Sequence, residues 1–150
     1  LCIEPYEMPW LEQTGVTVVR ERVEAVGLEP FLALEAGDLL FIDSSHMVRP
    51  QGDVLREFLE ILPQLKPGVV VHVHDIYTPR DYPETRLREE VRFWNEQYLL
   101  EALLSGGSNL RVVAALNFLK HDHPGVLERC CPVLAAHPEA EPGSFWMVVK

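Results

Sequence analysis

The sequence predicts an α/β fold whose central strands run parallel. Two apolar runs, residues 38–43 and 68–75, carry the β-branched and aromatic residues of buried strands, and each ends at an acid. Between them, residues 53–65 place apolar side chains at helical spacing, and Pro67-Gly68 then acts as a stop signal. The pattern predicts a strand, a helix and a second strand.

Both acids of this unit are expected at one edge of the sheet. A right-handed crossover makes the two strands parallel, so their carboxyl ends meet on the same side. Ligands of open α/β sheets bind at that edge. Asp43 and Asp75 are therefore the first candidates for chemistry.

Composition narrows the class of protein. The chain has 150 residues, 47% of them hydrophobic, which is enough for one domain with a sizeable core, and we treat residues 1–150 as that single domain. The net charge of −10 argues against nucleic acid and anionic membrane surfaces as partners, and favours a small-molecule substrate. No apolar run approaches the roughly 18 residues of a membrane span, and no signal peptide is recognisable, so a cytoplasmic protein is expected.

The remaining segments are assigned from periodicity. The first five residues read as the end of a strand, so the domain is expected to be N-terminally incomplete. Residues 85–104 are predicted to form one long helix with Leu87, Val91, Trp94 and Tyr98 on a common stripe. Two further strands are predicted, at residues 110–116 and 144–149, and residues 117–143 carry no clear pattern.

Four short motifs in this order resemble a known family. They are Glu4 at the end of the opening strand, Phe-Ile-Asp-Ser-Ser-His at 41–46, Leu-Lys-Pro-Gly at 65–68 and Val-His-Asp-Ile at 73–76. Together they are similar to the class I S-adenosylmethionine-dependent methyltransferases, and most of all to the small-molecule O-methyltransferases of the macrocin and cephalosporin pathways.

The resemblance implies a Rossmann-like sheet, mostly parallel, with an antiparallel C-terminal strand. In such a sheet the first strand lies between the strands that here end in Glu4 and Asp43, and a Gly-rich loop after it binds the cofactor. The sequence contains neither. We therefore expect a sheet that lacks its usual first strand, with a hole in the hydrogen-bond ladder at that place.

The resemblance also implies site residues. Glu4 would accept hydrogen bonds from the ribose hydroxyls of S-adenosylmethionine, and Asp43 would lie near the methyl donor. Apart from the resemblance, His46 lies three residues beyond Asp43 in a short polar loop, where it would act as the base that takes the proton of a substrate hydroxyl or would instead bond to a neighbouring loop carbonyl. The family likeness leaves open whether a divalent metal ion (Mg²⁺, Mn²⁺ or Zn²⁺) assists, held by Asp43, His74 and Asp75.

Three functions follow as hypotheses. The first is an S-adenosylmethionine-dependent methyltransferase acting on a hydroxyl of a small molecule. The second is a metal-dependent hydrolase using His72, His74 and Asp75, since two histidines on one strand face can share a metal. The third is a non-catalytic methyltransferase-fold remnant, and a homo-oligomer is left open. Tyr77 and Tyr82, in a proline-bearing loop past the strand, are candidates for a substrate contact.

Overall fold

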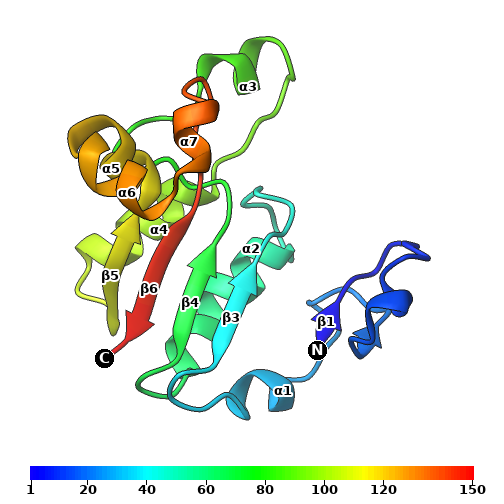
Figure 1. Cartoon of the computed structure of the whole chain (residues 1–150). Helices are drawn as coiled ribbons and strands as arrows, with labels where there is room; N and C mark the ends of the chain where they lie inside the picture. The colour runs from blue at the N-terminus through cyan, green and yellow to red at the C-terminus, as the bar shows by residue number, and fades with distance from the viewer.

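The computed structural model describes residues 1–150 and contains two separate sheets (Figure 1). The smaller sheet pairs β1 (Cys2–Ile3) with β2 (Val18–Val19) in parallel. The larger sheet has the strand order β3-β4-β6-β5. Its strands are β3 (Leu39–Ile42), β4 (Val70–Val73), β5 (Leu110–Ala115) and β6 (Phe145–Val149). The mixed sheet agrees with the predicted α/β class, and all four predicted strands of this sheet are present.

The central pair has the predicted direction. β3 and β4 run parallel in a register that aligns Leu39 with Val70 and Ile42 with Val73. β6 lies antiparallel between β4 and β5, as expected of the C-terminal strand. The carboxyl ends of β3 and β4 therefore meet at one edge, and Asp43 and Asp75 follow these ends.

The predicted helix at 53–65 is present but not uniform. It begins as α2 (Asp53–Leu55), widens into the π-helical turn η2 (Arg56–Ile61) and ends as the 3-10 turn η3 (Leu62–Gln64). Pro63 has no backbone N–H to donate, so regular α-helical bonding cannot continue through it. The wide turn brings Ile61 into the core and leaves Leu59 half exposed, which the α-helical spacing did not predict.

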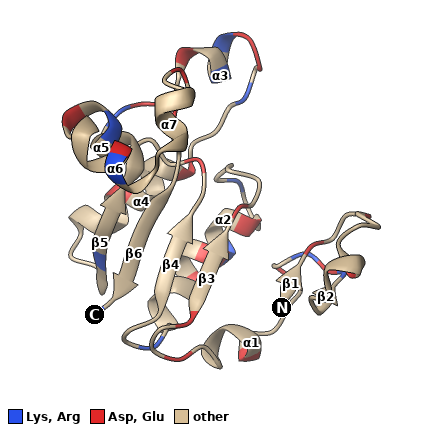
Figure 2. Ribbon diagram, viewed as in Figure 1, with Lys and Arg blue, Asp and Glu red and all other residues tan.

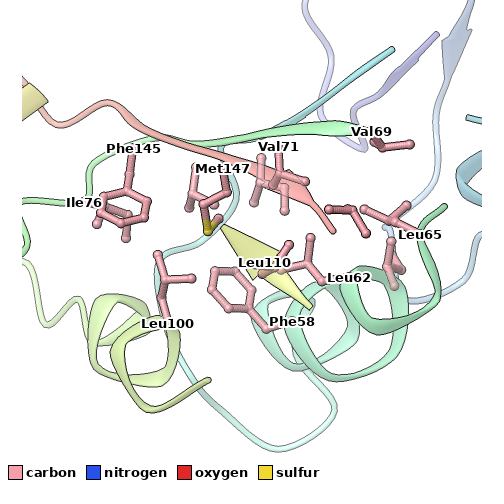
Figure 3. Close-up of a cluster of buried hydrophobic side chains, with 14 of the residues drawn as sticks. Phe58, Leu62, Leu65, Val69, Val71, Ile76, Leu100, Leu110, Phe145 and Met147 are labelled. Carbon is pink, nitrogen blue, oxygen red and sulfur yellow. The ribbon is translucent and has the colours of Figure 1, made fainter. Parts of the chain in front are cut away.

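The main core lies between the larger sheet and this helical segment (Figure 3). Phe58 and Leu62 face Val71 and Met147 of the sheet, and all four are buried. Leu100 of α4 (Glu96–Ser105) packs into the same cluster. Strands β3, β4 and β6 carry no Lys, Arg, Asp or Glu, as Figure 2 shows, although Leu39 and Phe41 of β3 are about half exposed.

The long helix predicted for residues 85–104 is wrong in its extent. The structure has two helices, α3 (Glu84–Arg88) and α4, with a non-helical segment between them. Val91 in that segment adopts a φ of 55°, which is incompatible with a right-handed helix. Of the predicted stripe only Trp94 is buried, because the segment turns to pack Trp94 beside His46. Tertiary contact overrides the local periodicity here.

Short helices make up the rest of the chain. Residues 117–143, left unassigned from the sequence, form most of a small helical layer that connects the end of β5 to the start of β6 (Figure 1). The helices of this layer are α5 (Leu116–Asp122), α6 (Pro124–Cys130) and α7 (Val133–Ala136). The N-terminal part of the chain has two more short helices, η1 (Glu12–Thr14) and α1 (Glu29–Leu32). No helix combines the length and the apolar character that crossing a bilayer requires.

A gap separates the two sheets. β1 pairs only with β2, and β3 is the edge strand of the larger sheet. The N–H groups of Cys2 and Glu4 bond to β2, so the alternate residue Ile3 turns its backbone groups to the other side. A cavity of about 920 Å³ lies between the sheets, lined by residues of both β1 and β3. The six strands in two sheets fall short of one continuous sheet, and the break lies where the hole was expected.

Candidate functional site

The cavity between the sheets brings two sequence-predicted residues together. Glu4 follows β1 and Asp43 follows β3, and both line this cavity. Glu4 is half-buried, and its Oε1 accepts a hydrogen bond of 2.8 Å from the backbone N–H of Tyr6. Its other carboxylate oxygen has no bond of this kind. The arrangement offers carboxylate oxygens from two directions to a ligand with hydroxyl or amino donors.

The loop after β3 is fixed by the helical segment that follows it. Ser45 donates to Asp53 through both its backbone N–H (2.8 Å) and its hydroxyl (2.6 Å). The Ser44 hydroxyl donates to Glu57 at 2.8 Å. Burial raises the pKa of Glu57 to about 8, so this carboxyl is largely protonated at neutral pH. These bonds fix Ser44 and Ser45 to the helical segment that begins at Asp53.

His46 lies at the centre of the site. Its φ of 59° is left-handed, a conformation that is uncommon for a residue other than glycine. Nδ1 lies 2.5 Å from Oε1 of Glu96, and Nε2 lies 3.4 Å from Asp43 and 3.9 Å from Asp75. Asp43 and Asp75 therefore converge on one imidazole, as their positions at neighbouring strand ends predicted.

The neighbouring charges shift the pKa values of His46 and Asp43. Burial by itself lowers the pKa of His46, but the bonds to Asp43 and Glu96 and the nearby Asp75 outweigh it and raise the pKa to about 9. The bond to His46 lowers the pKa of Asp43. At neutral pH His46 thus carries a proton on both ring nitrogens: Nδ1–H donates to Glu96, and Nε2–H faces Asp43 and Asp75. It can accept a proton from a substrate only after it has lost its own.

The sequence did not point to Glu96. This carboxylate is completely buried, and burial raises its pKa. The available signal was its place on α4, since residues 96, 100 and 103 share one helical face and the other two are leucines that pack on the core. A carboxylate on an otherwise apolar stripe indicates a buried partner.

The expected metal ligands do not come together. No group of three His, Cys, Asp or Glu side chains lies in an arrangement that could hold a metal ion. Nε2 of His74 lies 3.8 Å from Asp75, but the His74 ring contacts Phe41 and His72 on the sheet face. The imidazole that approaches both Asp43 and Asp75 is that of His46. The donor set therefore does not fit the predicted metal site.

His72 also differs from a metal ligand. Its ring stacks on that of Trp146, with ring centroids 4.3 Å apart and an interplanar angle of 10°. The rings of His72 and Phe41 form a T-shaped pair with centroids 4.8 Å apart. Burial lowers the pKa of His72, which favours the neutral ring. Its Nε2 is buried without a hydrogen-bond partner. The three-ligand arrangement that the hydrolase hypothesis needs, with His72, His74 and Asp75, is not formed.

The two tyrosines named as candidates for a substrate contact lie inside the protein. Tyr77 and Tyr82 are buried and form a small aromatic cluster with Trp94. The Tyr82 hydroxyl accepts from the N–H of Gln97, and the Gln97 side chain accepts from the N–H of Tyr77. Aromatic packing and satisfied polar groups make them part of the scaffold behind the site. The prolines of the loop gave no sign of this.

Comparison with known families adds one match. Residues 8–76 match a methyltransferase domain. The matched part of the chain runs from before β2 to just after β4 and includes Asp43, His46 and Asp75. It supports a methyltransferase domain and leaves the particular methyltransferase group undetermined. No curated protein and no solved structure matches the chain significantly.

Proposed function

We propose that the protein is an S-adenosylmethionine-dependent methyltransferase that acts on a hydroxyl group of a small molecule. The observation that carries this is the convergence of Asp43, Asp75 and His46 at the carboxyl edge of a parallel strand pair, inside the methyltransferase-matched segment. The cavity beside this edge, about 920 Å³, is of the size that small-molecule ligands occupy.

The cavity walls suggest a division of roles. Glu4 would accept the two hydroxyls of the cofactor ribose, since a carboxylate can receive two hydrogen bonds from a vicinal diol. Asp43 lines the same cavity and also approaches His46, so it stands between the cofactor side and the acceptor side. S-adenosylmethionine, when bound, would supply an electrophilic methyl group on a sulfonium.

The acceptor would meet His46 and the two carboxylates. A substrate hydroxyl could donate its hydrogen to Asp43 or Asp75, which accept hydrogen bonds when ionised. The protonated His46 balances part of the negative charge that the acidic side chains place there. We assign no step to a metal ion, because the expected ligands do not form a coordinating group.

One alternative to the methyltransferase proposal is supported by the gap between the two sheets. The gap between β1 and β3 interrupts the sheet beside the cofactor cavity, so the chain could be a methyltransferase-fold remnant that does not bind the cofactor. The hydrolase hypothesis has no such support in the arrangement of His72, His74 and Asp75. Binding of the cofactor separates the two remaining functions.

Isothermal titration with S-adenosylhomocysteine, the demethylated product, tests the proposal. We expect saturable binding by the wild-type chain and at least about tenfold weaker binding by Glu4→Gln, because hydrogen bonds to a charged acceptor contribute about 1.5–3 kcal/mol. Glu21→Gln, the same change at an exposed residue outside the cavity lining, is the matched control and should bind as the wild type does. No binding by the folded wild-type chain would favour the remnant.

A further inference from the structure

Glu96 is a buried carboxylate with a single side-chain partner. It is 0% exposed, its Oε1 lies 2.5 Å from Nδ1 of His46, and its Oε2 is buried without a hydrogen-bond partner. Burying a carboxylate is costly unless strong hydrogen bonds compensate it. Because Oε2 of Glu96 has no hydrogen-bond partner, we infer that this residue does more than fill the core.

The backbone of the His46 loop is held without the Glu96 side chain. The His46 carbonyl accepts from the backbone N–H groups of Asn95 (2.9 Å) and Glu96 (3.3 Å). In return, the Asn95 side-chain oxygen accepts from the N–H of Val48 at 2.5 Å. These bonds fasten the loop to the start of α4 at His46 and at Val48. The carboxylate of Glu96 is thus not needed to place the loop.

What the carboxylate does fix is the ring. Trp94 packs against the imidazole with ring centroids 4.5 Å apart, which limits its tilt. An imidazole in such a slot can still turn over about its Cβ–Cγ bond, and turning would put Cδ2 in the place of Nδ1 and Cε1 in the place of Nε2. The contact of Glu96 with Nδ1 selects one orientation, because only then does Nδ1–H meet the buried acceptor. Nε2 then faces Asp43 and Asp75.

We propose that Glu96 is a positioning residue of the site, which holds the His46 ring with Nδ1 inward so that Nε2 is the nitrogen presented to the methyl acceptor. The link to the acceptor rests on the proposed function, whereas the fixed ring orientation does not. Any proton that passes between the acceptor and His46 would therefore pass at Nε2. Asp43 and Asp75 stand on that same side of the ring.

Nuclear magnetic resonance of the histidine ring nitrogens tests the orientation directly. The His46 signals are assigned by their loss in His46→Asn, since Asn also tolerates a left-handed φ. In the wild-type protein we expect a slowly exchanging His46 Nδ1 proton, shifted downfield by its short bond to a carboxylate. Absence of that signal from the folded wild-type chain would overturn the proposal without any Glu96 variant having to fold.

Glu96→Gln and Glu96→Ala then measure the contribution of the carboxylate. Glutamine keeps an acceptor oxygen and loses the charge, so its Nδ1 proton should exchange about tenfold faster, and in the alanine variant the signal should be lost. Glu101→Gln, on the same helix but bonded to Thr78, is the matched control and should leave the His46 signal unchanged. An unchanged signal in a folded Glu96→Ala variant would refute the positioning role.

The two proposals fail in different ways. If the chain does not bind S-adenosylhomocysteine but shows the protected Nδ1 proton, the methyltransferase assignment fails and the positioning of His46 stands. If it binds the product and the Nδ1 proton exchanges freely, the proposed function stands and the role of Glu96 falls.

Discussion

The two sheets of this protein differ in how deeply their residues are buried. Every buried residue lies between Phe31 and Val149, and none lies in the first 28 residues, which include β1 and β2. The larger sheet has helices packed on a continuous apolar cluster, whereas Ile3 and Val23 only touch the margin of that cluster. A two-stranded sheet with so little burial is marginal by itself.

This difference divides the candidate site. His46, Asp43, Asp75 and Glu96 belong to the well-packed part, where each backbone is held by neighbouring elements. Glu4 belongs to the lightly packed part and reaches the site across the gap. We infer that the acceptor side of the site is preorganised, while the ribose side depends on how firmly the smaller sheet is held.

The largest expected effect comes from the core of the larger sheet. Phe58→Ala should lower the free energy of unfolding by about 3–5 kcal/mol, since Phe58 is fully buried and its loss leaves a cavity. Ile3→Ala in β1 should cost only about 1 kcal/mol, because its side chain is half-buried. Chemical denaturation monitored by circular dichroism measures both. Equal losses of unfolding free energy in the two variants would show that the two sheets do not differ in their contribution to stability.

A smaller effect depends on pH and on the preorganised half of the site. The pKa of His46 is raised to about 9 in the folded chain, above its unfolded value of about 6.5. Its protonation therefore stabilises the fold fully below about pH 6.5, and this stabilisation is lost as the pH rises through 9. The double variant His46→Asn with Glu96→Gln removes both members of the buried pair.

The difference in unfolding free energy between wild type and this double variant should decrease by about 2–3 kcal/mol from pH 6 to pH 10. Denaturation at a series of pH values measures it. Glu57 is present in both proteins, so most of its titration cancels in the difference. The part of its raised pKa that is due to Glu96 is lost in the variant, and it changes the difference in the same direction as His46 does. A difference that does not change with pH would mean that His46 is neutral in the folded chain.

The smallest effect concerns the N-terminal unit. The Arg20 guanidinium bonds to Glu12 and to the backbone carbonyls of Glu4 and Tyr6, and so ties the chain after β1 to the end of β2. Arg20→Ala should change the free energy of global unfolding by only about 0.5 kcal/mol, since exposed polar contacts contribute little. It should nevertheless raise the hydrogen-exchange rates of the Cys2 and Glu4 amides several-fold.

Hydrogen exchange followed by mass spectrometry reads this out segment by segment, with β4 and β6 as internal references. Glu12→Gln, which leaves the Arg20 bonds to the carbonyls in place, should have a weaker effect on the same amides. If Arg20→Ala destabilises the whole molecule as strongly as a core substitution, the smaller sheet is more closely integrated than its burial suggests.

The strands of the larger sheet could be predicted because their signal is local. Apolar runs that each end at an acid predicted β3 and β4, and the crossover rule predicted their direction. The break before α4 could not be predicted in this way. Trp94 leaves the helical stripe to pack on His46, which lies 48 positions earlier in the chain, and periodicity within one segment contains nothing of that contact.

The same reasoning explains what the sequence missed in the site. That Asp43, Asp75 and His46 lie close together could be predicted, because strand ends and short polar loops have a recognisable place in an α/β sheet. The position of Glu96 beside them could not be predicted, because its partner His46 lies 50 positions away in the chain. The predicted ligand His74 was adjacent in sequence to Asp75 but lies among the aromatic rings of the sheet face.

The left-handed backbone at His46 recurs at Asp75, whose φ is 54°, so two residues that face each other both hold a conformation in which glycine would be more comfortable. Glycine at position 46 would relax the backbone, but it would leave the buried Glu96 carboxylate without its partner. Breaking a buried pair costs about 3–5 kcal/mol, which exceeds the roughly 1–3 kcal/mol of backbone strain that glycine would relieve. Natural selection for stability would therefore retain histidine at position 46, although its backbone alone favours glycine.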